Sequence, residues 1–470
     1  MKSILILLFI IMLSGNGCSR EVNKETPFKI KIKTDNKGVS SSTQFTIPTI
    51  DGGYNYNVDC NDDGIDEATE VEGNYTCNYD VAGEYTLSIS SVFPRIYFYD
   101  EGEIKKDFTD HLKLLSIEQW GTGRWRSMEG AFGYTSNMIV NATDTPNLTQ
   151  VTDMNYMFHH AKALNQDLSR WDVSNVTSMV SMFGGATAFN QDLSRWDVGK
   201  VTDVSAMFRD ATSFNQDLSR WDVSNVTSMV WMFSHATAFN QNLSRWDVGK
   251  VTSMTAMFNE AIIFNQNLSD WDVSNVTGMA YMFNNATVFN QDLSRWDVGK
   301  VSNIRGMFAG TKAFNQYLNS WNVSNVTDMY GVFAGAMAFN QELNDWDVSN
   351  VASMVFMFNG TKSFNQDLSR WDVSSVIDMG SMFRKARAFN QDLSAWDVSR
   401  VSDMSSMFNS VTLSTKNYDS LLIGWKSLAL QPNISFNAGN STYSAGVATE
   451  AKNVLINSYG WKVSDGGQAP

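Results

Sequence analysis

The chain has 470 residues, of which 43% are hydrophobic and 13% aromatic, so it is apolar enough to fold around a substantial core. Its formal net charge is −14, and no block of lysine and arginine interrupts the acidic balance. A nucleic-acid partner is therefore not expected, because a nucleic-acid surface needs clustered cations.

The start of the chain has the pattern of an export signal. Lys2 precedes an apolar run from Ile4 to Leu13, which is too short to cross a bilayer as a helix but suits a signal peptide. Small residues then lead to Cys18, an arrangement that resembles the lipobox of bacterial lipoproteins. Residues 1–18 are thus expected to be an export signal. The resemblance implies that Cys18 is lipidated, and that this anchor is the protein's sole membrane contact at the outer membrane or cell surface.

One residue departs from the lipobox pattern. Gly15 stands where that motif usually has leucine. A soluble secreted protein is therefore the alternative localisation.

Residues 26–107 have the pattern of a small all-β domain. Five runs are rich in alternating, β-branched or aromatic residues, and pairs such as Gly-Gly and Asp-Gly separate them. The runs are FKIKIKT, TQFTIPTI, YNYNVDC, NYTCNYD and EYTLSISSV. Their spacing predicts a β-sandwich, and VDCNDDG with YDVAGEYTLSIS resembles PKD-type immunoglobulin-like modules. In an exported chain, the close pair Cys60 and Cys77 is expected to form a disulfide.

Residues 59–70 match the spacing of a calcium-binding loop, D-x-[DN]-x-[DN]-G-x5-E. The candidate Ca²⁺ ligands are Asp59, Asn61, Asp63 and Glu70. Oxygen ligands at this spacing can surround Ca²⁺, with Gly64 for the sharp turn. An EF-hand also needs a helix on each side, whereas both flanks here are strand-like. An acidic β-turn without a metal ion is therefore the alternative.

The centre of the chain repeats every 25 residues. Ten tryptophans, from Trp171 to Trp396, mark the period, and one copy reads FNQDLSRWDVGKVTDVSAMFRDATS. A fixed period of this size indicates a solenoid, in which each coil buries its apolar edges against its neighbours. We expect the repeats to span residues 151–412. Residues 108–150 are expected to form an N-terminal cap with a degenerate repeat, and residues 413–470 a C-terminal cap.

Each copy is expected to contain a short strand and then a short helix or 3₁₀ turn. Leu193-x-x-Trp196-x-Val198 has strand spacing, which places Arg195 and Asp197 on the opposite face. The apolar residues that follow fit one helical stripe, and these are Val201, Val204, Met207, Phe208 and Ala211. Thr202 is the expected N-cap. The recurring Asn190 and Gln191 are expected to satisfy backbone groups at the bend.

The repeat W-D-V-S-x-V-T-x-M-x-x-M-F resembles that of the BspA-like leucine-rich-repeat bacterial surface proteins. The resemblance implies an exported solenoid that binds extracellular or host proteins. The expected fold is therefore α/β: a leucine-rich-repeat-like solenoid preceded by a small all-β sandwich. For the C-terminal cap, the apolar spacing predicts a helix over Tyr418–Leu428, and ISFNAG, ATEAKNVLINSYG and WKVSD predict strand, helix and strand.

The charged residues beside each tryptophan are the candidate protein-binding surface. They are Arg170, Asp172, Arg195, Asp197, Arg220, Asp222, Arg245, Asp247, Arg295 and Asp297. We expect columns of arginine and aspartate that pair across neighbouring coils. A glycan-binding module is the alternative, because Trp231 and Tyr281 are expected to be exposed on alternate coils. A structural spacer is a second alternative.

An enzyme is not expected, and no cofactor is expected apart from the candidate Ca²⁺. The four histidines lie outside the regular repeat positions, and no nucleophile motif stands beside them. The sequence also has no P-loop, Rossmann fingerprint or zinc-binding spacing.

Overall fold

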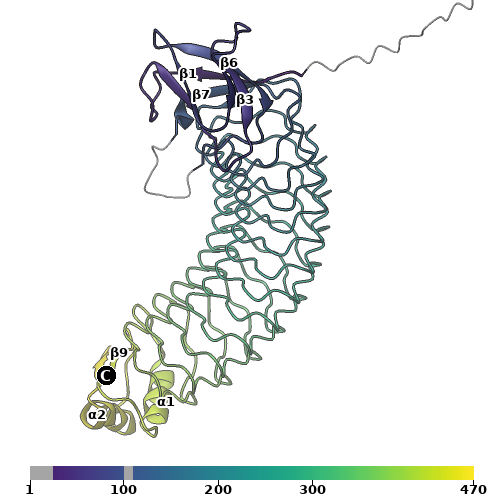
Figure 1. Cartoon of the computed structure of the whole chain (residues 1–470). Coiled ribbons are helices and arrows are strands. Elements are labelled where there is room, and N and C mark those ends of the chain that lie inside the picture. The colour runs from purple at the N-terminus through teal and green to yellow at the C-terminus, as the bar shows by residue number, and fades with distance from the viewer. Residues whose placement is uncertain (1–24, 100–108) are drawn as a thin grey trace, which may run out of the picture.

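The computed structural model describes residues 25–99 and 109–470. Figure 1 shows a β-domain at the N-terminal end, a curved stack of coils in the middle and a cap with helices α1 (Thr415–Trp425) and α2 (Val447–Tyr459) at the C-terminal end. The predicted export signal and Cys18 lie outside the described residues. Over the ranges that the structure does describe, no helix is both long and apolar enough to span a membrane.

The N-terminal domain consists of two sheets. The larger has the strand order β4-β3-β6-β1-β7-β8, and the smaller pairs β2 with β5. The strands are β1 (Phe28–Lys33), β2 (Gln44–Ile47), β3 (Asn55–Asp59), β4 (Ala68–Val71), β5 (Tyr75–Asn78), β6 (Glu84–Val92), β7 (Leu114–Gln119) and β8 (Ile139–Val140). Strand β1 alternates buried apolar residues with lysines, as a sheet with one face on a core requires. All five predicted runs form strands, and β4 is an additional one.

The predicted boundary at residue 107 is wrong, because the large sheet continues beyond it. Strand β7 pairs antiparallel with β1, and β8 pairs parallel with β7. The sheet of the N-terminal domain thereby continues into the first coil. A short 3₁₀ helix, η1 (His111–Lys113), precedes β7. On the smaller sheet, a disulfide joins Cys77 of β5 to Cys60, with a Cα–Cα distance of 5.8 Å.

The strand predicted around each tryptophan is not present. In the copy from Phe189, the segment is a turn in which the Trp196 N–H donates to the Leu193 carbonyl at 3.0 Å. Trp196 and Val198 are nevertheless buried, and Arg195 and Asp197 are exposed. Buried and exposed residues thus alternate here as they would in a strand, but the backbone does not pair with a neighbouring coil as a strand would.

The backbone ladder between coils lies in the segment for which a helix was predicted. We call Val204–Asp210 and its equivalents in the other coils the coil ladder. Ala206, Phe208 and Asp210 donate N–H bonds of 2.7–2.9 Å to the next coil, and the intervening N–H groups close i→i+3 turns. Ala206 and Asp210 have left-handed backbone angles, with φ of 54° and 58°. The predicted helix is therefore wrong, because a helix would consume the N–H groups that join the coils.

The predicted N-cap is wrong as well, because Thr202 makes a contact between coils instead. Both the backbone N–H and the hydroxyl of Thr202 bond to the Thr177 carbonyl, at 2.8 and 3.2 Å. The predicted amide contacts are confirmed: the Asn190 side-chain oxygen accepts from the Asn215 N–H and from the Gln216 side chain, both at 2.9 Å.

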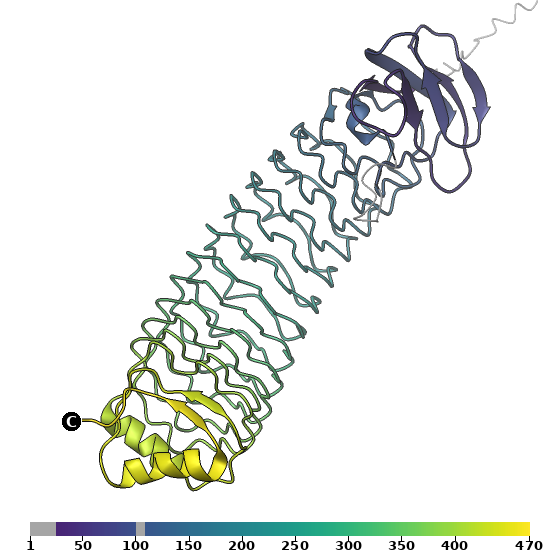
Figure 2. The ribbon, with the colours of Figure 1, turned by 90° about the vertical axis from the view of Figure 1, so that its left-hand side faces the viewer.

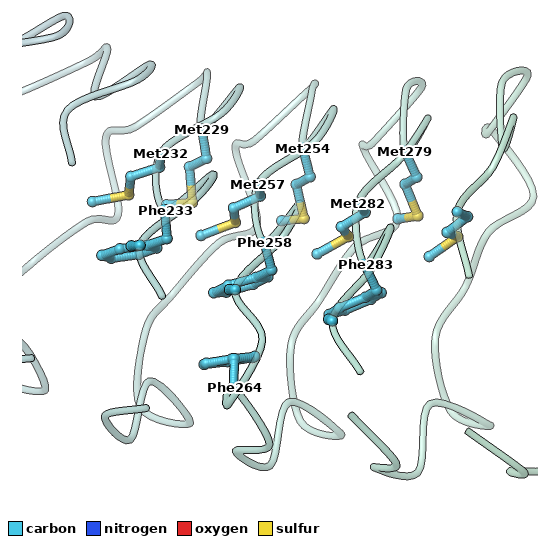
Figure 3. Close-up of a cluster of buried hydrophobic side chains, with 14 of the residues drawn as sticks. Met229, Met232, Phe233, Met254, Met257, Phe258, Phe264, Met279, Met282 and Phe283 are labelled. Carbon is cyan, nitrogen blue, oxygen red and sulfur yellow. The ribbon is translucent and has the colours of Figure 1, made fainter. Parts of the chain in front are cut away.

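Columns of identical side chains fill the interior of the stack. Figure 3 shows methionine and phenylalanine columns in successive coils, among them Phe233, Phe258 and Phe283. The tryptophans form a further column, and each indole from Trp196 to Trp396 donates to a leucine carbonyl of the preceding coil at 2.8–3.0 Å. Each coil therefore depends on its neighbours both for apolar burial and for hydrogen bonds.

The C-terminal cap has the predicted helix, strand, helix and strand. They are α1 (Thr415–Trp425), β9 (Ser435–Asn437), α2 (Val447–Tyr459) and β10 (Lys462–Ser464). The Trp425 indole donates to the Leu393 carbonyl at 3.2 Å, so α1 extends the tryptophan column. Strand β9 extends the coil ladder, since the Phe408 backbone N–H donates to the Asn437 carbonyl. Strand β10 then pairs parallel with β9.

Candidate recognition surface

The coil ladder lies on the inner side of the curved stack. Ladder strands are about 4.8 Å apart, whereas stacked Phe208 and Phe233 have ring centroids 5.7 Å apart, and Trp271 and Trp296 6.5 Å apart. The coils thus diverge from the ladder toward the tryptophans, and the stack must bend with the ladder inside. Figure 2 looks onto this inner side, where the two C-terminal strands continue the coils.

The copies differ from one another at several positions of the inner surface. At the position of Ala206, successive coils carry Trp231, Ala256, Tyr281 and then glycine. Trp231 is 44% exposed and Tyr281 36% exposed, although the other fourteen tryptophans are buried. Two further half-buried rings, Tyr330 and Phe356, contact each other edge to face at 5.6 Å. Four of the coils between residues 209 and 356 therefore carry an exposed or half-buried aromatic ring on the coil ladder.

Arginine side chains hold these rings in place. The Arg209 guanidinium lies 5.0 Å from the centre of the Trp231 ring, and Arg305 lies 4.6 Å from that of Tyr330. The pKa of Arg305 is raised, mainly by a hydrogen bond with Tyr281. Arg305 also forms an ion pair with Asp328. The Tyr281 ring fills the space above Gly306, where an added Cβ would come within 2.6 Å of it. The rings are thus preorganised.

A histidine lies between two carboxylates beside Trp231. The His235 Nδ1 is 3.8 Å from an Asp210 oxygen, and its Nε2 is 3.4 Å from a Glu260 oxygen. The three side chains come from consecutive coils. Because the two nitrogens face opposite ways, they cannot ligate one metal ion together.

The first coils carry a second aromatic group on the same columns. Tyr99 stacks on Tyr156 at 4.5 Å, and Tyr134 stacks on His160 at 5.2 Å. His159 packs edge-on against Tyr156, and its Nδ1 lies 3.0 Å from the Ser181 hydroxyl. Burial lowers the pKa of His159 to about 3, so this imidazole is neutral at physiological pH.

The predicted arginine–aspartate surface lies elsewhere, on the outer side beside the tryptophans. Its residues are exposed, and they form one arginine column and one aspartate column across the coils, as expected. The predicted pairing between the two columns is wrong. Among residues 25–99 and 109–470, none of these ten residues pairs with another of them within 4 Å, and Arg295 pairs instead with Asp270 at 3.8 Å.

The physical reason is that each aspartate serves its own turn. Asp197 accepts the Gly199 N–H at 3.1 Å, and Asp172 accepts both the N–H and the hydroxyl of Ser174. The Ser174 hydrogen bonds lower the pKa of Asp172. The carboxylates are therefore occupied by hydrogen bonds, whereas the guanidinium groups of Arg195 and its equivalents extend into solvent.

The candidate calcium residues do not surround a common point. Asp59 accepts backbone N–H bonds from Asn61, Asp63 and Gly64, which is the pattern of a tight acidic turn. Glu70 lies in the exposed strand β4. Within the part of the chain that the structure describes, no three histidine, cysteine, aspartate or glutamate side chains are placed to hold a metal ion. Strand β4 pairs with β3, so Glu70 lies beside β3 and away from the turn at Asp59. Hydrogen bonds from the protein backbone therefore close this turn.

The predicted exposure of Trp231 and Tyr281 is confirmed, but the sequence pattern alone did not place them on the inner side of the stack. The signal was present, because Trp231 and Tyr281 replace alanine or glycine in a repeat whose other large apolar positions hardly change. Which side of the coil they occupy depends on contacts between coils, which one copy does not encode.

The tandem repeats define the class, a repeat protein built from short irregular coils with few helices and strands. A family model described as "Mycoplasma protein of unknown function, DUF285" matches residues 126–246, 227–343 and 307–421, which together cover more than half of the chain. The chain belongs to this family. No curated protein matches it.

Proposed function

We propose that this protein is a non-catalytic binding scaffold that is exported and displayed on the cell surface, where it holds an extracellular or host protein. In this proposal residues 151–412 are a leucine-rich-repeat solenoid of the BspA-like kind, the N-terminal sheets are an immunoglobulin- or PKD-like module, and Cys18 carries the lipid anchor. The sequence resemblances support these three assignments.

One observation carries the proposal. The large apolar residues that recur in every copy are buried, whereas the inner ladder has positions that differ between copies and include the exposed Trp231 and Tyr281. Stacked repeats commonly bind partners on such extended concave surfaces. Exposed aromatic residues flanked by arginine are also the side chains most enriched at protein interfaces.

The outer arginine column is a second candidate contact surface. Its guanidinium groups are not neutralised by the aspartates beside them, because those carboxylates bond to their own turns. A partner with an acidic segment would fit this column. Paired variants separate the two surfaces: Trp231→Ala with Tyr281→Ala on the inner side, and Arg195→Ala with Arg220→Ala on the outer side.

The test is binding of the intact exported protein to a panel of extracellular-matrix proteins, with both paired variants as probes. We expect the inner pair to weaken binding and the outer pair to change mainly its salt dependence. Loss only in the outer pair would move the site to the arginine column. If the protein bound no member of the panel and no glycan, the structural spacer would be favoured. Metabolic labelling with a fatty acid, compared between the natural chain and Cys18→Ala, tests the anchor.

A further inference from the structure

We propose that the coil ladder between Arg209 and Phe356 binds an uncharged, extended glycan chain whose sugar rings stack on Trp231 and Tyr281. The inference rests on the proposed function in that it uses the same inner surface. It goes beyond that function by assigning a second class of ligand, a glycan, to this surface.

The first argument is the exposure of the rings. The stack buries fourteen of its fifteen tryptophans, yet it leaves Trp231 44% exposed. Alanine stands at the equivalent positions 206 and 256, so the fold has no need for an indole there. Aromatic faces attract flat partners with apolar C–H surfaces, and the pyranose ring of a sugar is such a partner.

The second argument is the spacing of the rings. Trp231 and Tyr281 are two coils apart, which is about 10 Å at the ladder spacing, and the small Ala256 lies between them. In an extended β-linked glycan each sugar is turned over relative to the last, so the same face recurs at every second sugar. A rigid ladder with one ring on every second coil matches that pattern.

The third argument is charge. The cation of Arg209 lies 3.4 Å from Asp210, and that of Arg305 is paired with Asp328. The two cations nearest the rings are therefore already neutralised and offer no free charge to a sulfate or carboxylate. The remaining polar groups on the neighbouring coils include Asn259, Glu260 and Asn284. Amides and carboxylates are suited to hydroxyl groups, which both donate and accept hydrogen bonds.

A proline-rich peptide is the main competing ligand for spaced aromatic rings. Such peptides dock in aromatic-lined grooves, whereas Tyr281 packs down onto Gly306 of the next coil, which makes a platform instead of two walls. The observations therefore favour the glycan, and the peptide becomes an arm of the test.

The experiment uses the fluorescence of Trp231 in the full chain. Because the other fourteen tryptophans are buried, acrylamide should quench mainly this residue. Hexamers of β-1,4-linked glucose and of β-1,4-linked N-acetylglucosamine are the glycan probes. A sulfated glycan and a proline-rich peptide are the alternatives. At least one uncharged hexamer is expected to protect Trp231 from quenching, with an affinity that is insensitive to salt.

Two variants and a matched control complete the test by calorimetry. Trp231→Ala and Tyr281→Ala are each expected to weaken hexamer binding about tenfold, which corresponds to the loss of one aromatic contact. Tyr317→Ala removes a ring that is 46% exposed but lies outside the coil ladder, and it should leave binding unchanged.

Four outcomes would overturn the inference: no hexamer protects Trp231, the peptide protects it instead, binding depends on the sulfated glycan, or Tyr317→Ala weakens binding as much as the ladder variants. Protein binding that survives without any glycan binding would leave the proposed scaffold function standing and remove only this inference.

Discussion

The ammonium group of Lys200 donates a hydrogen bond to the side-chain oxygen of Asn175, one coil away, at 2.8 Å. The same bond joins Lys250 to Asn225 and Lys300 to Asn275, at 2.7 Å each. It explains the alternation of WDVSN and WDVGK over residues 171–300, because one kind of coil supplies the acceptor and the next supplies the cation.

The first prediction concerns the asparagine of this pair. The Asn225 amide nitrogen also donates to the Gly199 carbonyl at 2.7 Å, so Asn225→Ala removes two contacts. We expect the free energy of unfolding to fall by about 1–2 kcal/mol. Denaturant titration followed by circular dichroism measures it. Ser213→Ala is the control, on an exposed residue where neighbouring coils carry Ala188 and Ala238, and an equal loss in both variants would contradict the role of the pair.

The second prediction concerns the indole nitrogen of the tryptophan column. Trp271→Phe keeps an aromatic ring but loses the 3.0 Å bond to the Leu243 carbonyl. Substitution is expected to destabilise the stack by about 1–3 kcal/mol, from the lost bond and the smaller ring. Thermal unfolding of the two proteins gives the difference. A stability unchanged by the substitution would mean that the indole contributes only apolar surface.

The third prediction concerns a buried ion pair in the N-terminal domain. Lys113 and Asp110 are both fully buried, and the Lys113 ammonium donates to the carbonyls of Ser40, Ser41 and Gln44. Lys113→Met leaves the Asp110 carboxylate without its cation, which typically costs about 3–5 kcal/mol. Proteolysis of this domain should accelerate accordingly. The control is Lys31→Met, an exposed lysine paired with Glu84, which should behave like the natural protein.

The fourth prediction concerns pH. Burial lowers the pKa of His159 to about 3, whereas in the unfolded chain it returns to about 6.5. Between these values only the unfolded state binds the proton, so stability falls as the pH decreases through this window. From pH 7 to pH 5 the loss from this residue is about 2 kcal/mol. Unfolding midpoints of the natural chain and of His159→Gln check it, and identical pH dependence would refute it.

Burial along the repeat could be predicted from one copy, because it follows the apolar pattern. Leu193, Trp196, Val198 and Phe208 are all buried, as that pattern requires. The amide contacts of Asn190 were predictable for a similar reason, since a bend leaves backbone groups that need a partner.

The backbone path could not be predicted in the same way. The steps of three, three, one and three residues after Val201 suit a helix, but they equally suit a ladder in which left-handed residues turn every second N–H toward the next coil. Those residues include Ala206 and Trp231, which carry no sequence signal for positive φ. Hydrogen bonds between residues 24 apart decide between the helix and the ladder. The same bonds decide that the ladder lies on the inner side of the stack.

The bond between Lys200 and Asn175 has a consequence for how the chain changes length. Within residues 171–300, removing or adding 25 residues would place two asparagine coils or two lysine coils side by side and would break the pair at that junction, as the neighbouring Asn325 and Asn350 coils lack it. A change of 50 residues keeps every pair and both caps, and it alters the length by about 10 Å at the ladder spacing. Changes in length within this stretch are therefore expected to occur by pairs of coils, whereas the later coils can change one at a time.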